Sequence, residues 1–392
     1  MLRRIGALNF LDHIKYGALT VTLPLYLISR GIDVGEIGLI LSLLPLAFLL
    51  MRVVSSVFAD VVGVKPFFVA NTVFHTITNV IFLVAKTPLQ FGIGKISEGV
   101  TGAFFWAVDR TAIMARAHVK KYLSMMSAVR AFAAALGLIG AGLLIEYVSF
   151  ESVFLGLIGL GIVGIIISLT LRNRGATMHK LDWKSLLKAG RKQKDFWQVA
   201  IAAMMLNMPF LLLFTFLLPV MMDIEMGMDY LEIAVMLTAF YASIGLGGLL
   251  SAKMNLDEDK LLIFQMLAIP MIMFLPVSGT YFTIVLALAG FGLGVCFGIN
   301  EGMVGYFLEK GKGMSSRIAT LFGPYNVAAF IVLAGAGFAL EAFGSEPLFV
   351  FCSVLLAGFV FLARKITNDY EGKKGVMDYR PHKGIPQTQI RE

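Results

Sequence analysis

Long apolar stretches divide the chain into segments of membrane-spanning length. A helix needs about 20 mainly apolar residues to cross the hydrocarbon core of a bilayer, and twelve stretches of the sequence approach that length. Short polar turns separate most of them. The pattern predicts an all-α membrane protein with transmembrane helices near residues 5–28, 34–58, 66–86, 88–114, 123–146, 150–171, 196–219, 230–252, 260–278, 280–306, 315–340 and 346–366.

The sequence also repeats itself. The heptapeptide Gly-Ala-Gly-Leu-Leu-Ile-Glu at residues 140–146 recurs as Gly-Ala-Gly-Phe-Ala-Leu-Glu at residues 335–341, an offset of 195, and glycines of spans four and ten match at an offset of 200. Such a repeat predicts two like-oriented, pseudo-symmetric six-helix bundles, as in an alternating-access carrier. The predicted divisions are a first bundle at 1–171, a cytoplasmic linker at 172–195, a second bundle at 196–366 and a disordered cytoplasmic tail at 367–392.

Composition supports a membrane protein, because 58% of the 392 residues are hydrophobic and only 15% are charged. A soluble protein needs more polar surface than this. The net charge of +8 is concentrated in alternate loops, while the other loops are acidic. This distribution follows the positive-inside rule and predicts that both termini are cytoplasmic in a multi-pass plasma-membrane protein. It argues against a nucleic-acid partner.

The segment between spans two and three carries a family signature. Residues 56–66 read Ser-Val-Phe-Ala-Asp-Val-Val-Gly-Val-Lys-Pro. This segment resembles the loop signature of the major facilitator superfamily, although Val61 and Val64 stand where the family usually has arginine. The resemblance implies a twelve-helix transporter in which this loop latches the two bundles on the cytoplasmic side. Asp60, Gly63 and Lys65 match the signature and are assigned to the cytoplasmic gate, and the latch role carries over to Asp60 and Lys65.

Span four adds a second likeness to this superfamily. Lys95 precedes Gly99 by four residues, which resembles the basic residue that proton-driven drug exporters of the superfamily use in proton transfer. Asp109 resembles the acidic residue at the inner end of the same helix and is followed by Arg110. Arg130 of span five is placed to pair with Asp109 or Asp60, with a structural role favoured. We assign Asp109, Arg110 and Arg130 to the cytoplasmic gate.

Ionisable residues inside the spans mark the predicted transport pathway. A charge in hydrocarbon costs about 2.5 kcal/mol or more, so it normally faces a cavity or a partner. Lys15 and Glu98 each lie about 15 Å along their helices, near the midplane. We predict that they face a central cavity and pair there, either as a proton-coupling device or as a static ion pair. Asp12 and Arg52 are predicted to form a second pair, in a gating or a structural role.

The second bundle carries fewer charges in its predicted spans. Its predicted pathway residues are Asn207, Asn300 and Glu301. Methionines and phenylalanines surround Asn207, which suits a cavity for an amphipathic substrate or, equally, packing against lipid. A hinge is predicted at residues 323–326, which read Gly-Pro-Tyr-Asn.

These patterns favour a secondary transporter that moves a small organic solute. Proton-coupled export of an amphipathic compound is the leading hypothesis. Proton-coupled uptake of a polar metabolite and a lipid flippase on the same scaffold are the alternatives. The sequence contains no Gly-x-x-x-x-Gly-Lys-Ser/Thr loop and its five histidines are scattered, so direct use of ATP, an enzymatic site, a metal and a cofactor are not expected. We expect a monomer whose partners are its substrate, protons and the lipid bilayer.

Overall fold

The computed structural model describes residues 2–114, 119–171, 194–254, 258–308 and 314–371 of the chain. All regular elements within these ranges are helical, which confirms the predicted all-α class. The first half contains α1 (Leu2–Ser29), α2 (Val34–Val62), α3 (Lys65–Val84), α4 (Pro88–Met114), α5 (Val119–Tyr147) and α6 (Phe150–Leu169).

The second half follows the same order with more irregular helices. Its long helices match the predicted spans closely. They are α8 (Lys194–Leu212), which continues through η1 (Leu213–Leu217), α9 (Leu218–Val220) and η2 (Met221–Glu225), then α10 (Tyr230–Lys253), α11 (Glu258–Phe274), the short turns η3 (Leu275–Val277) and η4 (Gly279–Tyr281), α12 (Phe282–Leu308), α13 (Met314–Leu321), α14 (Gly323–Phe343) and α15 (Glu346–Glu371).

Prolines account for two of these irregularities. Pro209 lies inside α8 and Pro219 is the second residue of the short α9, and a π-helical turn follows each of them. A proline removes one backbone donor, and neighbouring residues adopt other hydrogen-bond spacings to compensate. The predicted eleventh span is divided at Phe322 into α13 and α14, with Pro324 in the first turn of α14. The predicted hinge therefore coincides with a helix break.

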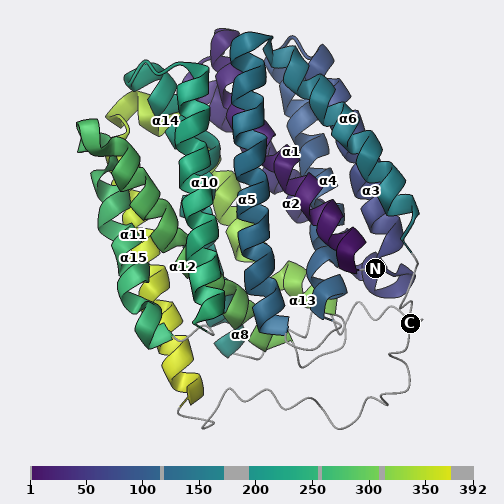
Figure 1. Ribbon diagram of the computed structural model, residues 1–392, viewed down its shortest axis with the longest axis vertical. Coiled ribbons are helices and arrows are strands. Elements are labelled where there is room, and N and C mark those ends of the chain that lie inside the picture. The colour runs from purple at the N-terminus through teal and green to yellow at the C-terminus, as the bar shows by residue number, and fades with distance from the viewer. Residues whose placement is uncertain (1, 115–118, 172–193, 255–257, 309–313, 372–392) are drawn as a thin grey trace.

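The helix contacts show the predicted pseudo-symmetry. Within the halves, α1 packs on α5 as α8 packs on α14, α2 on α4 as α10 on α12, and α3 on α6 as α11 on α15. Between the halves, α2 packs against α14 and α5 against α10. Exchanging the two halves converts each of these interfaces into the other. Figure 1 shows the halves side by side, with α5 and α10 adjacent at their junction.

Small residues allow the two halves to approach closely. A Cβ atom at Gly337 of α14 would overlap the Val34 carbonyl of α2, and one at Gly142 of α5 would overlap Ala234 of α10. In lipid, helix association depends on such close packing rather than on hydrophobicity. These contacts lie near the end of the molecule opposite the start of α1, which we call the far face. Its opposite, where α1 begins and α15 ends, is the terminal face.

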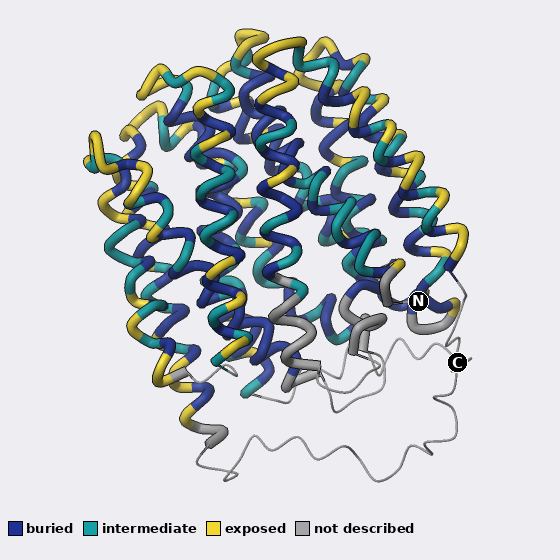
Figure 2. Tube along the Cα trace, viewed as in Figure 1, coloured by how far each residue is buried: buried dark blue, intermediate teal, exposed yellow. Residues whose placement is uncertain are grey.

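The outer surface of the bundle is suited to lipid. Large apolar side chains such as Leu89, Ile166, Ile263 and Phe361 are exposed, and Figure 2 shows exposed residues along the outer helices and buried residues through the centre. Among the described residues, ten helices are long and apolar enough to cross a membrane. Helices α1 and α4 are not among them. Both have sufficient length, but each carries several ionisable residues.

Parts of the predicted domain division lie outside the described residues, including most of the linker and the tail after Glu371. The last helix, α15, continues to Glu371, so the first five residues of the predicted disordered tail are helical.

Candidate functional site

A cavity of about 230 Å³ lies between the two halves. Both halves contribute residues to its wall. Its lining combines charged, amide and aromatic side chains: Asp12, His13, Tyr16, Leu44, Pro45, Phe48, Arg52, Trp106, Arg130 and Ala131 from the first half, and Asn207, Phe210, Leu211, Tyr241, Ile244, Phe297, Glu301, Phe322, Tyr325 and Asn326 from the second.

The repeat is visible in this lining. Many lining residues occur in pairs at an offset of 195 or 196, which means that the two halves present equivalent positions to one cavity. Trp106 of α4 and Glu301 of α12 form one such pair, so these helices share the offset of 195 and not the offset of 200 predicted from their glycines. The other pairs are Asp12 and Asn207, Tyr16 and Leu211, Pro45 and Tyr241, Phe48 and Ile244, Arg130 and Tyr325, and Ala131 and Asn326.

A buried triad joins three helices of the first half at the cavity wall. The Arg130 guanidinium of α5 donates to Asp109 of α4, and its Nε donates to Asn9 Oδ1 of α1 at 3.2 Å. Asn9 Nδ2 donates to the other Asp109 oxygen at 2.7 Å. Asp109 is fully buried. The predicted pairing of Arg130 with Asp109 is confirmed, and each charge of the triad has an opposite partner, as burial requires.

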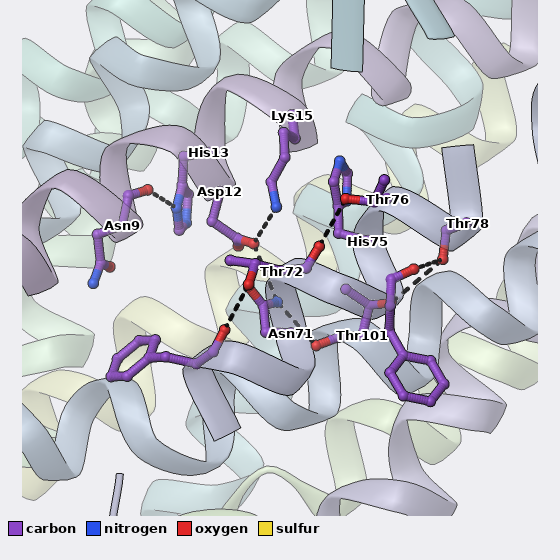
Figure 3. Close-up of polar contacts among 12 residues, drawn as sticks. Asn9, Asp12, His13, Lys15, Asn71, Thr72, His75, Thr76, Thr78 and Thr101 are labelled. Atoms are coloured by element: carbon purple, nitrogen blue, oxygen red, sulfur yellow. Dashed lines mark hydrogen bonds and ion pairs between the residues drawn. The ribbon is translucent and has the colours of Figure 1, made fainter. Parts of the chain in front are cut away.

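A second ion pair lies within α1. Lys15 Nζ and Asp12 Oδ1 are 3.2 Å apart, and Asn71 Nδ2 of α3 donates to the same Asp12 oxygen at 3.4 Å. Figure 3 shows the Lys15 side chain directed toward Asp12, with Asn71 below the pair. Asp12 lines the cavity, whereas Lys15 is buried behind it.

The pairing of Lys15 with Glu98 was predicted wrongly. Glu98 Oε2 is 2.8 Å from Nζ of Lys95 on its own helix. Both observed pairs join residues three apart, because side chains one turn apart on a helix face the same direction. Neither Lys95 nor Glu98 lines the cavity. The three-residue spacing within each helix therefore decides the pairing. The prediction rested instead on the similar depth of Lys15 and Glu98 in the membrane.

The predicted pair of Asp12 and Arg52 is also not formed, since Asp12 binds Lys15. The Arg52 guanidinium instead lies between two aromatic rings, 5.1 Å from the centre of Phe48 and 5.0 Å from that of Phe322. Phe322 belongs to the second half, at the break before α14. This cation–π arrangement joins the two halves across the cavity and is stronger where water is excluded.

An aromatic wall bounds the cavity on the side of the second half. Phe210 of α8 contacts Phe297 of α12 with ring centres 4.8 Å apart and lies 5.8 Å from Tyr241 of α10. Phe214 stacks behind it and is 3.9 Å from Tyr241. Of the three phenylalanines predicted around Asn207, Phe210 lines the cavity, whereas Phe214 and Phe216 do not. The predicted methionines are not among the lining residues.

The sequence did not identify the tyrosines or Trp106 as cavity residues. Applying the repeat offset of 195 to Arg130 would have indicated Tyr325. Glu301 lines the cavity as predicted, while its neighbour Asn300 is 1% exposed and points elsewhere.

The predicted cytoplasmic gate is only partly described. Gly63 ends α2 with φ of 91°, a conformation that favours glycine, and its N–H donates to the Ala59 carbonyl. Lys65 begins α3. The side chains of Asp60 and Arg110 lie outside the described residues, so their latch role stays a prediction. Within the described ranges, no group of three or more His, Cys, Asp or Glu side chains is arranged to hold a metal ion.

The sequence matches the profile of the Major Facilitator Superfamily over residues 5–314. The chain belongs to this superfamily. It is therefore a multi-pass membrane protein of a transporter family, as the loop between α2 and α3 indicated.

Curated relatives in this superfamily include proteins named "Putative multidrug resistance protein MdtD". The chain is similar to that of Citrobacter koseri, with 29% identity over 150 residues, and to that of Klebsiella pneumoniae subsp. pneumoniae, with 30% identity over 150 residues. Each match covers 36% of this chain and 32% of the relative. The similarity thus spans about a third of the length of these relatives.

Solved structures confirm the major facilitator fold over nearly the whole chain. The E. coli fucose:proton symporter FucP superimposes with a TM-score of 0.72 and 12% identity, over 93% of this chain and 98% of FucP. The human organic anion transporter MFSD10 gives a TM-score of 0.71 and 13% identity, over 92% of this chain and 99% of MFSD10.

Proposed function

We propose that this major facilitator protein is a proton-coupled secondary transporter that exports a small amphipathic compound from the cytoplasm. The observation that carries the proposal is the cavity between the halves, where charged groups and an aromatic wall face the same space. Aromatic surfaces bind the apolar part of a ligand, and a few convergent polar groups orient it. The similarity to proteins named for multidrug resistance supports the export direction.

The position of this cavity between the halves supports alternating access. The halves are closed at the far face, where Gly35 N donates to Glu341 Oε1 at 2.8 Å across the α2–α14 interface. At the same face Tyr26 packs on Phe150, and Phe150 packs on Tyr230 of the second half. With cytoplasmic termini, this arrangement corresponds to a state closed to the outside. Transport would require the halves to rock apart at these contacts.

Asp12 is the strongest candidate for the proton-binding residue. Its carboxylate faces the cavity, is 18% exposed and is balanced by Lys15. A proton or a cationic substrate group at Asp12 would compete with the Lys15 ammonium. This competition would couple the occupancy of the cavity to the ion pair within α1. Glu98, the residue favoured by sequence, lies outside the cavity and is paired with Lys95.

Transport in liposomes tests this function. Purified protein would be reconstituted with an imposed pH gradient and offered ethidium, rhodamine 6G, fucose and a fluorescent phospholipid as separate probes. Gradient-driven movement of the dyes supports amphipathic export. Movement of fucose alone favours uptake of a polar metabolite, and transfer of the phospholipid between leaflets without a gradient favours a flippase. A flux of every probe equal to that of protein-free liposomes would contradict the proposal.

A further inference from the structure

A stripe of buried amides and an imidazole runs along α3, outside the cavity. Asn71, His75 and Asn79 are four residues apart, so they lie on one face of the helix, and they are 2%, 3% and 0% exposed. Unsatisfied polar groups are costly at membrane depth. An apolar helix would serve as scaffold at lower cost, so the stripe calls for a functional explanation.

The stripe is connected to the cavity through Asp12. Asn71 Nδ2 donates to Asp12 Oδ1 and, at 3.1 Å, to the Thr101 carbonyl of α4. One turn farther along α3, His75 lies close enough to Lys15 for their charges to interact. Figure 3 shows the Lys15 ammonium between Asp12 and His75. Lys15 of α1 thus pairs with Asp12 and lies near this face of α3.

An open acceptor lies at the end of the stripe. Asn79 Nδ2 is 2.9 Å from the His75 carbonyl, which can only accept, and 2.7 Å from His75 Nε2. Asn79 Oδ1 therefore points away from these contacts, and it has no hydrogen-bond partner among the described residues. A buried carbonyl oxygen without a donor is an unusual cost in a native protein. The Lys15 ammonium, which lies near His75, can supply such a donor.

We propose that Lys15 is a switch that docks on Asn79 Oδ1, beside His75, when Asp12 takes up a proton from the cavity. In the present state the ammonium pairs with the Asp12 carboxylate. Protonation of Asp12 cancels that attraction, and the flexible lysine stem allows the ammonium to move to α3 while it keeps its own proton. Lys15, His75 and Asn79 are positioning residues that act through Asp12. This inference rests on the proposed proton coupling.

Other charged groups around Asp12 and Lys15 leave this route open. His13 of α1, Arg52 of α2, Arg130 of α5 and Glu301 of α12 line the same cavity as Asp12. On α4, Lys95 and Glu98 neutralise each other. Helix α6 contributes a hydroxyl to α3, where Ser168 Oγ and Thr72 Oγ1 are 3.2 Å apart on a different face of the helix.

Infrared titration of the full-length protein in liposomes tests the switch without a substrate. The band of the protonated Asp12 carboxyl group, assigned by its loss in Asp12→Asn, gives the pH midpoint at which Asp12 is protonated. Asn79→Leu removes the alternative acceptor, so we expect the midpoint to fall by about one pH unit, the size of a hydrogen bond to a charged group. Asn79→Asp attracts the ammonium away from Asp12 and should raise the midpoint. Thr76→Val, near Gly161 of α6, is the matched control and should leave it unchanged.

The outcomes separate the switch from the proposed function. Opposite shifts of the Asp12 midpoint in the two Asn79 variants support the switch. If the wild type transports none of the four probes, that result overturns the proposed coupling but not the switch. Equal midpoints in Asn79→Leu and Thr76→Val would overturn the switch while leaving transport intact. If Asn79→Leu does not fold, Asn79→Asp decides, because a midpoint that does not rise contradicts the proposal. Absence of any Asp12 band while the protein stays folded also overturns it.

Discussion

The two halves of the molecule share a fold but differ in chemistry and regularity. In the first half, Asp12 and Arg130 face the cavity as members of buried ion pairs. Their counterparts in the second half are Asn207 and Tyr325, which are uncharged. Lys15 likewise corresponds to Phe210 of the aromatic wall. At these three positions the first half supplies charge and the second supplies uncharged or aromatic side chains, whereas the pair of Trp106 and Glu301 has the opposite arrangement.

The halves also differ in how their helices pack. In the first half, α1 and α5 meet at Gly17 and Gly137, where an added Cβ atom would overlap the opposite backbone. The equivalent positions on α8 and α14 are Leu212 and Val332. The second half also contains the π-helical turns and the break at Phe322. The first half thus has the closer contact between its first and fifth helices and the more regular helices, and it also holds the buried ion pairs.

Among variants that test this difference in helix packing, Gly137→Val should have the largest effect on stability. The added side chain collides with the Ile14 carbonyl of α1, and a backbone atom cannot move aside as a flexible side chain can. We expect loss of folded protein, measured by size-exclusion profile and thermal unfolding in detergent. Gly140→Ala is the control, because nothing lies within 4 Å of its added Cβ atom. Equal stability of the two variants would show that the close packing of α1 on α5 is unimportant.

Removing one member of the buried triad should have the next largest effect. Arg130→Ala leaves Asp109 as an uncompensated buried charge, which costs about 3–5 kcal/mol. The counterpart change Tyr325→Phe removes one hydroxyl and should cost about 1 kcal/mol or less. Unfolding in mixed detergent micelles measures both. Similar losses in the two variants would mean that the halves do not differ in their dependence on ion pairing.

Asp12→Asn makes the first half resemble the second at the cavity. We expect it to abolish pH-gradient-driven flux in liposomes while downhill exchange of the same probe continues, because the proton-binding carboxylate is lost and the cavity is kept. Glu98→Gln should retain coupled flux, since Glu98 lies outside the cavity. Coupled transport by Asp12→Asn, together with its loss in Glu98→Gln, would return the coupling role to Glu98.

Substitution of the two glutamates that the repeat places at the far face, Glu341 and Glu146, should show the smallest difference between the halves. Glu341 accepts from Gly35 N in the first turn of α2, on the other half. Its counterpart Glu146 lies near α10, whose N-terminus is already capped by Asp229 and Glu232. A charge at a helix N-terminus stabilises by about 0.3–1 kcal/mol, so Glu341→Gln should increase opening of the far face about two- to five-fold. Glu146→Gln should not.

Maleimide labelling of Ile37→Cys measures that opening, because Ile37 is fully buried near the start of α2. The two native cysteines, Cys296 and Cys352, are buried and would be replaced by serine or alanine in the background. Equal labelling rates in the Glu341 and Glu146 variants would contradict a latch restricted to the α2–α14 interface.

The sequence was sufficient for the architecture because spans, repeat and loop charge depend on composition over long stretches. It also named Asp109 as one of the two predicted partners of Arg130, and that pair is the one observed. It failed for Lys15 and Glu98, although the three-residue spacing of both observed pairs was visible in the chain. Depth along a helix fixes only one coordinate of a side chain, and its direction around the helix was not known.

The same missing coordinate explains other differences at the site. Asn300 and Glu301 are adjacent in sequence, but one turns away from the cavity and the other lines it. Successive residues of a helix point about 100° apart, so only the packing of α12 decides between them. Tyr241 was missed for a related reason: in sequence it is one more apolar residue of a buried helix.

Filling the cavity between the halves tests most directly whether it is the transport site. Ala131 lines the cavity and is 4% exposed, whereas Leu136 on the same helix is 55% exposed. Gradient-driven flux of the transported probe in liposomes should be abolished by Ala131→Phe and unchanged by Leu136→Phe, with both variants folded. Wild-type flux in folded Ala131→Phe would contradict the account.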